Sequence, residues 1–277
     1  MKWLGRVVRR GGSAVEDISN SAWAAARLIE LHAGFERLLQ GLWPQTLARL
    51  EAMSPQGLSN VAWAYATALL DPKAPEAPQR RRLEGLFGAL AGAAERCAGR
   101  CKAQELANVA WAFARAAVEA RPLFASLAAA AVLEEFTAQN LCNFAWAFAT
   151  VACQDAALQA ALGRETSRRL EEFNLQGLSN LAWAAAVGGR DCEKLVEQLR
   201  SRLAGGEEGA VRNTLGVLGS RVLKGLKQER HGHHICSILS SYVFLHCHKP
   251  YKYADMICTF TLLRHMSCLY MYQMTSS

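Results

Sequence analysis

The stretch LSNVAWAYA, from Leu58 to Ala66, contains the pattern that decides the fold. Close copies follow as LANVAWAFA at 106–114, LCNFAWAFA at 141–149 and LSNLAWAAA at 178–186, and a weaker copy, ISNSAWAAA, precedes it at 18–26. The tryptophans of these five copies are separated by 40, 48, 35 and 37 residues. Self-similarity at such a period is typical of arrays in which neighbouring repeats share one core. An eroded sixth copy, VRNTLGVLG at 211–219, lacks the tryptophan.

Each copy predicts a helix. Alanine dominates it, no proline or glycine interrupts its centre, and apolar residues recur with helical spacing. In the second copy the apolar positions are Leu58, Val61, Ala62 and Tyr65. Ser54 supplies an N-cap before Pro55 at the first helical position, and Thr137 and Asn174 are equivalent caps for later copies. The helix starts are therefore predicted as well as the helices.

A second amphipathic stretch lies upstream of several copies, at 86–97, 123–136 and 158–173. Each repeat is therefore expected to contain two helices, with a loop at 71–82 absorbing the extra length of the longest interval. The sequence predicts an all-α protein, an αα-solenoid of about five to six two-helix repeats over residues 13–222.

The motif helix carries a second repeated face. At about 100° per residue, Gln56, Asn60 and Trp63 gather opposite Leu58. A helix defined on nearly every face is expected to be wedged between its neighbours. The repeated residues are then structural, with tryptophans filling gaps between repeats and amides bonding to backbone groups; the alternative is that asparagine contacts bases and tryptophan stacks on them. These residues are Asn20, Trp23, Asn60, Trp63, Asn108, Trp111, Asn143, Trp146, Asn180 and Trp183.

Composition narrows the class of protein. Apolar residues make up 51% of the 277, which is enough for a sizeable core, and a formal net charge of +7 favours an anionic partner. The nine cysteines are too few for a disulfide framework in a chain of this length, which indicates a reducing compartment. No apolar run approaches the ~20 residues of a membrane span, so no membrane partner is expected.

The motif Gln-x-Leu-x-Asn-x-Ala-Trp-Ala-x-Ala resembles the octotricopeptide repeats of organellar RNA-binding proteins. It is also similar to the repeats that precede the RAP domain in FAST-kinase-like proteins. The matching residues are Gln56, Leu58, Asn60, Ala62 and Trp63; Gln104, Leu106, Asn108, Ala110 and Trp111; Gln139, Leu141, Asn143, Ala145 and Trp146; and Gln176, Leu178, Asn180, Ala182 and Trp183. The first copy departs from the pattern with Glu16 in place of glutamine.

The resemblance implies an αα-solenoid that binds single-stranded RNA in mitochondria or plastids. Such a protein would act in RNA processing, stability or translation, alongside other organellar RNA-processing proteins. A RAP domain is not recognisable, so no nuclease-like chemistry is carried over. The alternative class, a protein-binding αα scaffold of the tetratricopeptide kind, stays open because both use an extended concave surface.

Basic residues outside the fixed motif are the candidate RNA contacts. They are Arg27, Arg115, Lys73, Arg80, Arg81, Arg82 and Lys102. Arg27 and Arg115 occupy equivalent helix-end positions that vary between copies, and each is expected to reach phosphate while contributing little to the core. Any one of these residues alone is better explained as a solvated surface charge, whereas the set as a whole favours binding. Further basic positions of this kind are Arg96, Arg100, Arg121, Arg164, Arg168, Arg169 and Arg190.

The two ends of the sequence depart from the repeats. Residues 1–12 are basic and lack an acid, which is typical of an organelle-import segment, of an ordinary basic N-terminus or of a truncated gene start; without import, a cytoplasmic location is expected. Residues 223–277 hold six of the seven histidines and five of the six tyrosines. This segment is expected to be disordered or weakly structured, or to be translated non-coding or frame-shifted sequence.

The sequence gives no sign of catalysis or of a bound cofactor. No phosphate-binding glycine loop, HExxH motif or nucleophile motif is present. The histidines and cysteines of the final segment match no zinc spacing, so no metal site is expected. The sequence therefore predicts a binding protein rather than an enzyme.

Overall fold

The computed structural model describes residues 15–32, 34–68, 77–153, 155–188 and 193–202. This part of the chain is 87% helical and contains no strand, which confirms the predicted all-α class. Its α-helices are α2 (Val15–Leu28), α3 (Gly34–Arg49), α4 (Pro55–Ala68), α5 (Ala77–Cys97), α6 (Ala103–Ala116), α7 (Arg121–Ala130), α8 (Ala138–Thr150), α9 (Ala156–Arg168), α10 (Leu175–Val187) and α11 (Glu193–Arg202).

A short 3₁₀ turn follows α2 and precedes each later motif helix. These turns are η1 (Ile29–Leu31), η2 (Leu50–Ala52), η3 (Ala98–Arg100), η4 (Leu133–Glu135) and η5 (Leu170–Glu172). From η2 onward each is followed by one extended residue, such as Met53 or Phe136, before the next helix is capped. A tight turn of this kind reverses the chain within a few residues, so the two helices of a pair stay close.

The predicted caps are confirmed at three of the motif helices. Ser54 Oγ accepts a hydrogen bond from the backbone of Gly57 at 3.2 Å, and Thr137 Oγ1 accepts one from Asn140 at 3.2 Å. Asn174 Oδ1 accepts from the backbone of Gly177 at 2.7 Å. Each bond satisfies an amide that the first turn of a helix leaves without an intrahelical partner.

One predicted boundary is wrong. The loop expected at 71–82 extends too far, because α5 already begins at Ala77 and its first turn includes Pro78. Proline is compatible with the first helical turn, where its missing N–H would have had no intrahelical acceptor. Proline content therefore indicated a loop where it actually marks a helix start.

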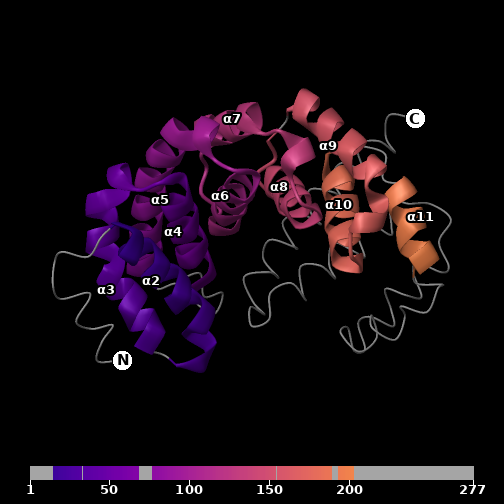
Figure 1. Cartoon of the computed structure of the whole chain (residues 1–277). Coiled ribbons are helices and arrows are strands. Elements are labelled where there is room, and N and C mark those ends of the chain that lie inside the picture. Colours follow the sequence, from indigo (N-terminus) through magenta and orange to yellow (C-terminus); the bar gives the residue numbers. More distant parts are fainter. Residues whose placement is uncertain (1–14, 33, 69–76, 154, 189–192, 203–277) are drawn as a thin grey trace, which may run out of the picture.

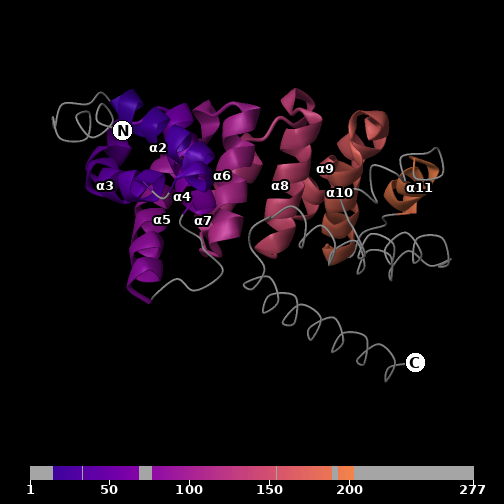
Figure 2. The same ribbon diagram turned by 90° about the horizontal axis from the view of Figure 1, so that it is seen from below.

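The motif helices form one continuous row. Each packs against the next, in the order α2, α4, α6, α8 and α10, and the row follows a curve whose inner side these helices line (Figure 1). The intervening helices α3, α5, α7 and α9 lie toward the outer side, and α11 packs on α10. Figure 2, turned by 90°, shows the same order along the row.

The core fills the space between the row and the outer helices. Tyr65 of α4 donates from Oη to the carbonyl of Leu39 in α3 at 3.0 Å, and its ring meets Trp43 edge-on at 5.3 Å. Burial raises the pKa of Tyr65 to about 12. Phe87 and Phe113 make the equivalent edge-on contact between α5 and α6, with ring centroids 5.0 Å apart. These aromatic pairs attach α3 to α4 and α5 to α6.

Several predicted regions lie outside the described residues: the basic segment at 1–12, the eroded copy at 211–219 and the segment 223–277. Among the helices that the structure does describe, none is long and apolar enough to cross a membrane.

Candidate nucleic-acid interface

We use the term motif face for the four equivalent positions that lie opposite the leucine side of each motif helix. Its residues are Glu16, Asn20, Trp23 and Arg27 in α2; Gln56, Asn60, Trp63 and Thr67 in α4; Gln104, Asn108, Trp111 and Arg115 in α6; Gln139, Asn143, Trp146 and Thr150 in α8; and Gln176, Asn180, Trp183 and Val187 in α10.

The motif face is the open side of the row. All four of its glutamines are exposed, as is Glu16, whereas the leucine or isoleucine that begins each copy is buried. The asparagines of α4, α6 and α8 are half-buried. The expectation that the motif helix is wedged on nearly every face is therefore wrong for this side.

Within the row, a motif helix packs against other helices on three of its sides, and the residues on those sides allow this close packing. At α4, α6 and α8 the leucine side meets the outer helices, and both flanks meet neighbouring motif helices. The flanking residues Ser59, Ala107 and Cys142 are small and buried. Small residues let the backbones of adjacent helices approach closely, which leaves only the motif face without a covering helix in the described part of the chain.

The tryptophans differ in exposure along the row. Trp23 is 44% exposed, Trp63 and Trp111 are half-buried, and Trp146 and Trp183 are 9% and 8% exposed. The rings of Trp146 and Trp183 are tilted toward each other with centroids 6.4 Å apart. Tryptophan thus fills the space between motif helices at α8 and α10, while at α2 it presents its ring to solvent.

The amides of the motif face also differ between helices. Gln139 Nε2 donates to Asn143 Oδ1 at 2.9 Å, a contact along one helix rather than between repeats. Asn180 is 8% exposed and its Oδ1 accepts no hydrogen bond from the described residues. A buried carbonyl oxygen without a donor is costly, so this position favours a ligand or water that donates to it.

Arginine occupies the last position of the face in α2 and α6, in two different settings. The Arg27 guanidinium lies 5.7 Å from the ring centroid of Trp23, and both side chains are exposed. The Arg115 guanidinium lies 5.4 Å from the ring of Trp111, but its Nε also donates to the carbonyl of Ala66 in α4 at 3.0 Å. Both arrangements place a cation over an indole face, which is a favourable contact.

The bond to Ala66 corrects one expectation about Arg115. This arginine was expected to contribute little to stability, yet it satisfies a carbonyl in the last turn of α4, which has no intrahelical donor. Arg115 therefore belongs to the motif face and also joins two motif helices, α4 and α6. The sequence pattern does not reveal this bond, since Arg27 has the same position relative to its tryptophan and lies on the first helix of the described row.

Of the remaining candidate arginines and lysines, the three that the structure describes are not among the motif-face residues. Arg81 and Arg82 are exposed on α5, in the outer layer. Lys102 is exposed at the start of α6, where its backbone N–H donates to Glu105 Oε2 at 2.8 Å. Lys73 lies outside the described residues, as does the side chain of Arg80. Contact between these residues and RNA stays a prediction, and it is independent of the motif face.

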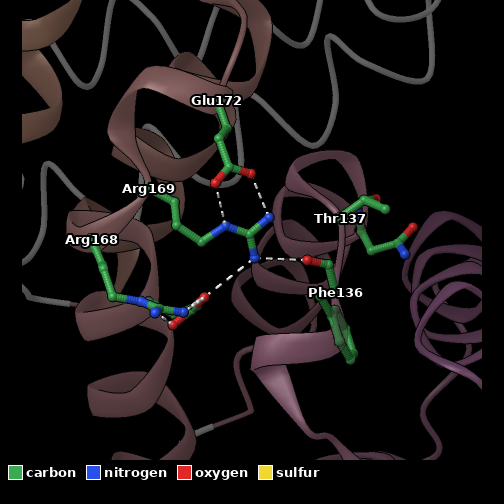
Figure 3. A network of polar contacts seen from close by, with 7 residues as sticks. Phe136, Thr137, Arg168, Arg169 and Glu172 are labelled. Carbon is green, nitrogen blue, oxygen red and sulfur yellow. Dashed lines mark hydrogen bonds and ion pairs between the residues drawn. The ribbon is translucent and has the colours of Figure 1, made fainter.

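Other basic residues in the described part of the chain are held by carboxylates. Arg96 pairs with Glu51, and Arg121 pairs with Glu119. The largest such network surrounds Arg169, whose guanidinium donates to both oxygens of Glu172 at 3.0 and 2.6 Å and to the Phe136 carbonyl at 2.7 Å (Figure 3). These residues were predicted to lie among the RNA contacts. The exposed pairs of Arg96 and Arg121 add little to stability, whereas the network of Arg169 is largely shielded from solvent and stabilises the protein.

Glu165 completes this network from α9. It accepts from Arg168 at 2.7 and 3.2 Å and from Arg169 at 3.2 Å, and its side chain is 8% exposed. The hydrogen bonds from Arg168, followed by those from Arg169, hold the pKa of the Glu165 carboxyl below its ordinary value. The network ties α9 and η5 to the residue that precedes the Thr137 cap of α8, so it fixes one repeat against the previous one.

No family model matches the chain, and no curated protein matches it.

Proposed function

We propose that the chain is a single-stranded RNA-binding protein, built as an αα-solenoid of two-helix repeats, whose motif face contacts the RNA. Its resemblance to octotricopeptide and FAST-kinase-like repeats supports a role in mitochondrial or plastid RNA processing, stability or translation. The observation that carries the proposal is the open motif face, on which exposed amides or carboxylates of the first position alternate with asparagines and tryptophans that are exposed at α2, half-buried at α4 and α6 and mostly buried at α8 and α10.

The chemistry of this face suits an unpaired strand. Indole rings stack on any base, at about 1–3 kcal/mol per base, and amide groups both donate to and accept from base edges. Paired bases hide these edges and faces in the duplex, so a row of amides and rings favours single-stranded over double-stranded RNA. Trp23, the most exposed tryptophan of the face, is the strongest stacking site.

The arginines of the face supply the contact with phosphate. Arg27 lies over Trp23 at the exposed edge of α2, so a base stacked on the indole would place its phosphate near the guanidinium. Arg115 repeats this arrangement two motif helices further along the row, with its orientation held by the Ala66 carbonyl. A bound strand would thus meet a cation at α2 and again at α6, with neutral threonine at α4 between them.

The test is a fluorescence titration of labelled single-stranded RNA with the full chain at several salt concentrations. For a single strand the slope of log K against log[salt] is about −0.7 per neutralised phosphate. We expect Arg27→Gln to weaken binding and to flatten this slope by a little under one unit. Arg37→Gln is the matched control, because Arg37 is exposed on α3 and loses the same charge outside the motif face.

Equal effects of Arg27→Gln and Arg37→Gln would show that only net charge matters and would remove the motif face from the site. If the folded protein binds no RNA at any salt concentration, the function is wrong, and the protein-binding scaffold becomes the better explanation. Binding of duplex RNA as tightly as single-stranded RNA would also contradict the proposal.

A further inference from the structure

Two cysteines meet at the turn between α5 and α6. Cys97 is the last residue of α5, Cys101 follows the η3 turn, and their Sγ atoms lie 3.9 Å apart in hydrogen-bond contact. Both are free thiols in the structure. We call these two residues the thiol pair. A disulfide requires the sulfurs to approach to about 2.05 Å, which side-chain rotation about the turn can provide more easily than movement of a helix.

The two sulfurs differ in access and share one hydrogen bond. Cys97 is 3% exposed, whereas Cys101 is half-buried and is the member that solvent reaches. The hydrogen bond from Cys101 lowers the pKa of Cys97 to about 7, and the same bond raises the pKa of Cys101. Arg100 favours the thiolate and Glu105 opposes it, so the two neighbouring charges act in opposite directions.

We propose that the thiol pair is an oxidation site at which Cys97 and Cys101 form a reversible intramolecular disulfide by exchange with a low-molecular-weight disulfide such as glutathione disulfide. The geometry carries this inference: two reduced sulfurs in contact, one open to solvent, in a turn of five residues. It does not depend on RNA binding.

The exchange has two steps, formation of a mixed disulfide on Cys101 and its displacement by Cys97. Once the pair has lost one proton, the remaining proton moves along the shared hydrogen bond between the two sulfurs. In the less populated form, which has this proton on Cys97, the Cys101 thiolate is open to solvent and attacks one sulfur of the small disulfide. The disulfide bond breaks, and the first small thiol leaves with a proton taken from water. Cys97 then loses its proton and attacks the Cys101 sulfur of the mixed disulfide, which expels the second small thiol. Two protein thiols are oxidised and one small disulfide is reduced to two thiols.

The other described cysteines lack this arrangement. Cys142 is 2% exposed, and burial raises its pKa to about 12. A Cβ added to Gly177 would lie 2.9 Å from the Cys142 sulfur, which shows how closely α10 covers it. Burial also raises the pKa of Cys153. Among the described residues no second sulfur contacts Cys142 or Cys153, so neither can form a local disulfide, and these two cysteines serve as internal controls.

The place of the pair gives its oxidation a structural consequence. The η3 turn joins α5 to α6 and packs against α7, and Lys102, the residue after Cys101, caps α6. A disulfide here would fix the turn that leads into the motif helix bearing Asn108 and Trp111. Oxidation would therefore restrict the positions that α6 can adopt when it packs against α5 and α7.

The experiment exposes the full chain to an excess of glutathione disulfide, quenches it with acid and labels the remaining thiols with an alkylating reagent. A protease that cuts after glutamate releases residues 96–105, with both cysteines in one peptide. We expect this peptide to carry no alkyl group and to be lighter by two hydrogens, and reduction with dithiothreitol to restore two alkylation sites. Cys142 and Cys153 should remain alkylatable under the same conditions.

Two variants separate the roles of the sulfurs. Cys97→Ser should trap glutathione on Cys101, because the resolving thiol is gone, whereas Cys101→Ser should leave Cys97 largely unmodified because it is buried. Circular dichroism confirms that each variant is folded before its cysteine modification is measured. Retention of both alkyl groups on the wild-type peptide would overturn the proposal, as would a link from Cys97 or Cys101 to any other cysteine.

Discussion

The two ends of the motif row place the same residue in opposite environments. At α2 the repeated tryptophan, Trp23, is 44% exposed and lies beside an exposed arginine. At α8 and α10 the equivalent Trp146 and Trp183 are 9% and 8% exposed and contact each other. The motif therefore sets which face of the helix the tryptophan occupies, while the neighbouring helix sets whether that ring is buried. One residue type can thus support packing at one end and stacking on a ligand at the other.

The repeated arginine shows the same contrast on a smaller scale. Arg27 and Arg115 both lie over the tryptophan four residues before them. Arg115 has a preceding motif helix, α4, whose Ala66 carbonyl it satisfies, whereas α2 is the first helix of the described row. An arginine at this position can therefore stabilise the junction between two motif helices as well as meet a phosphate.

The largest expected effect comes from truncating a buried tryptophan. Trp146→Ala should lower the free energy of unfolding by about 3–5 kcal/mol, because it leaves a cavity between α8 and α10. Trp23→Ala should lower it by less than about 1 kcal/mol and should instead weaken RNA binding. Urea denaturation and RNA titration of both variants measure the difference. Similar stability losses at the two positions would contradict the contrast in burial.

A second prediction concerns the network that fixes one repeat to the previous one. Glu165→Gln should lower the free energy of unfolding by about 1.5–3 kcal/mol at neutral pH, since it weakens charge-assisted bonds from Arg168 and Arg169. Glu95→Gln, on the exposed side of α5, is the matched control and should change it little. Chemical denaturation of the three proteins provides the comparison.

The pH dependence of the same variant sharpens the test. The pKa of Glu165 is lowered in the folded state, so its contribution is fully present above the ordinary carboxyl value of 4.5 and is lost as the pH falls through the folded value. The stability difference between wild type and Glu165→Gln should therefore shrink below pH 4.5. A difference that stays constant with pH would show that the ionised carboxylate is not responsible.

The smallest expected effect separates the two arginines. Arg115→Gln should lower the free energy of unfolding by about 1 kcal/mol through loss of the bond to Ala66, while Arg27→Gln should leave it unchanged. Both variants remove one positive charge, so net charge cannot account for a difference between them. Thermal denaturation of the pair measures it, and identical melting temperatures would remove the structural role of Arg115.

Local patterns allowed the helices and their starts to be predicted from sequence. The copies around Trp63, Trp111 and Trp146 repeat with helical spacing, and Ser54, Thr137 and Asn174 cap their helices as predicted. The 3₁₀ turns could not be predicted, because nothing in the residues before each cap distinguishes a tight turn from a continued helix. The early start of α5 was missed because proline indicates a loop and a helix start equally.

The candidate site was only partly predictable. The helical spacing of about 100° per residue placed Gln56, Asn60 and Trp63 on one face of the helix. Which face is open to solvent depends on where the outer helices pack, and a local sequence pattern does not contain this information. The bond from Arg115 to Ala66 and the network around Arg169 join residues 49 and 33 positions apart, which no local pattern reveals. The contact between Cys97 and Cys101 could have been predicted, since the two cysteines lie four positions apart at a helix end.

The central claim is that RNA lies on the motif face, and photo-crosslinking tests it most directly. A uridine-rich single-stranded RNA is irradiated with the full chain, and the crosslinked peptides are identified by mass spectrometry. We expect crosslinks on the motif helices, strongest at Trp23 and present at Trp63 and Trp111, and few on α3, α5, α7 or α9. Crosslinks confined to those outer helices, or to the basic residues Arg81 and Arg82 of α5, would contradict the claim.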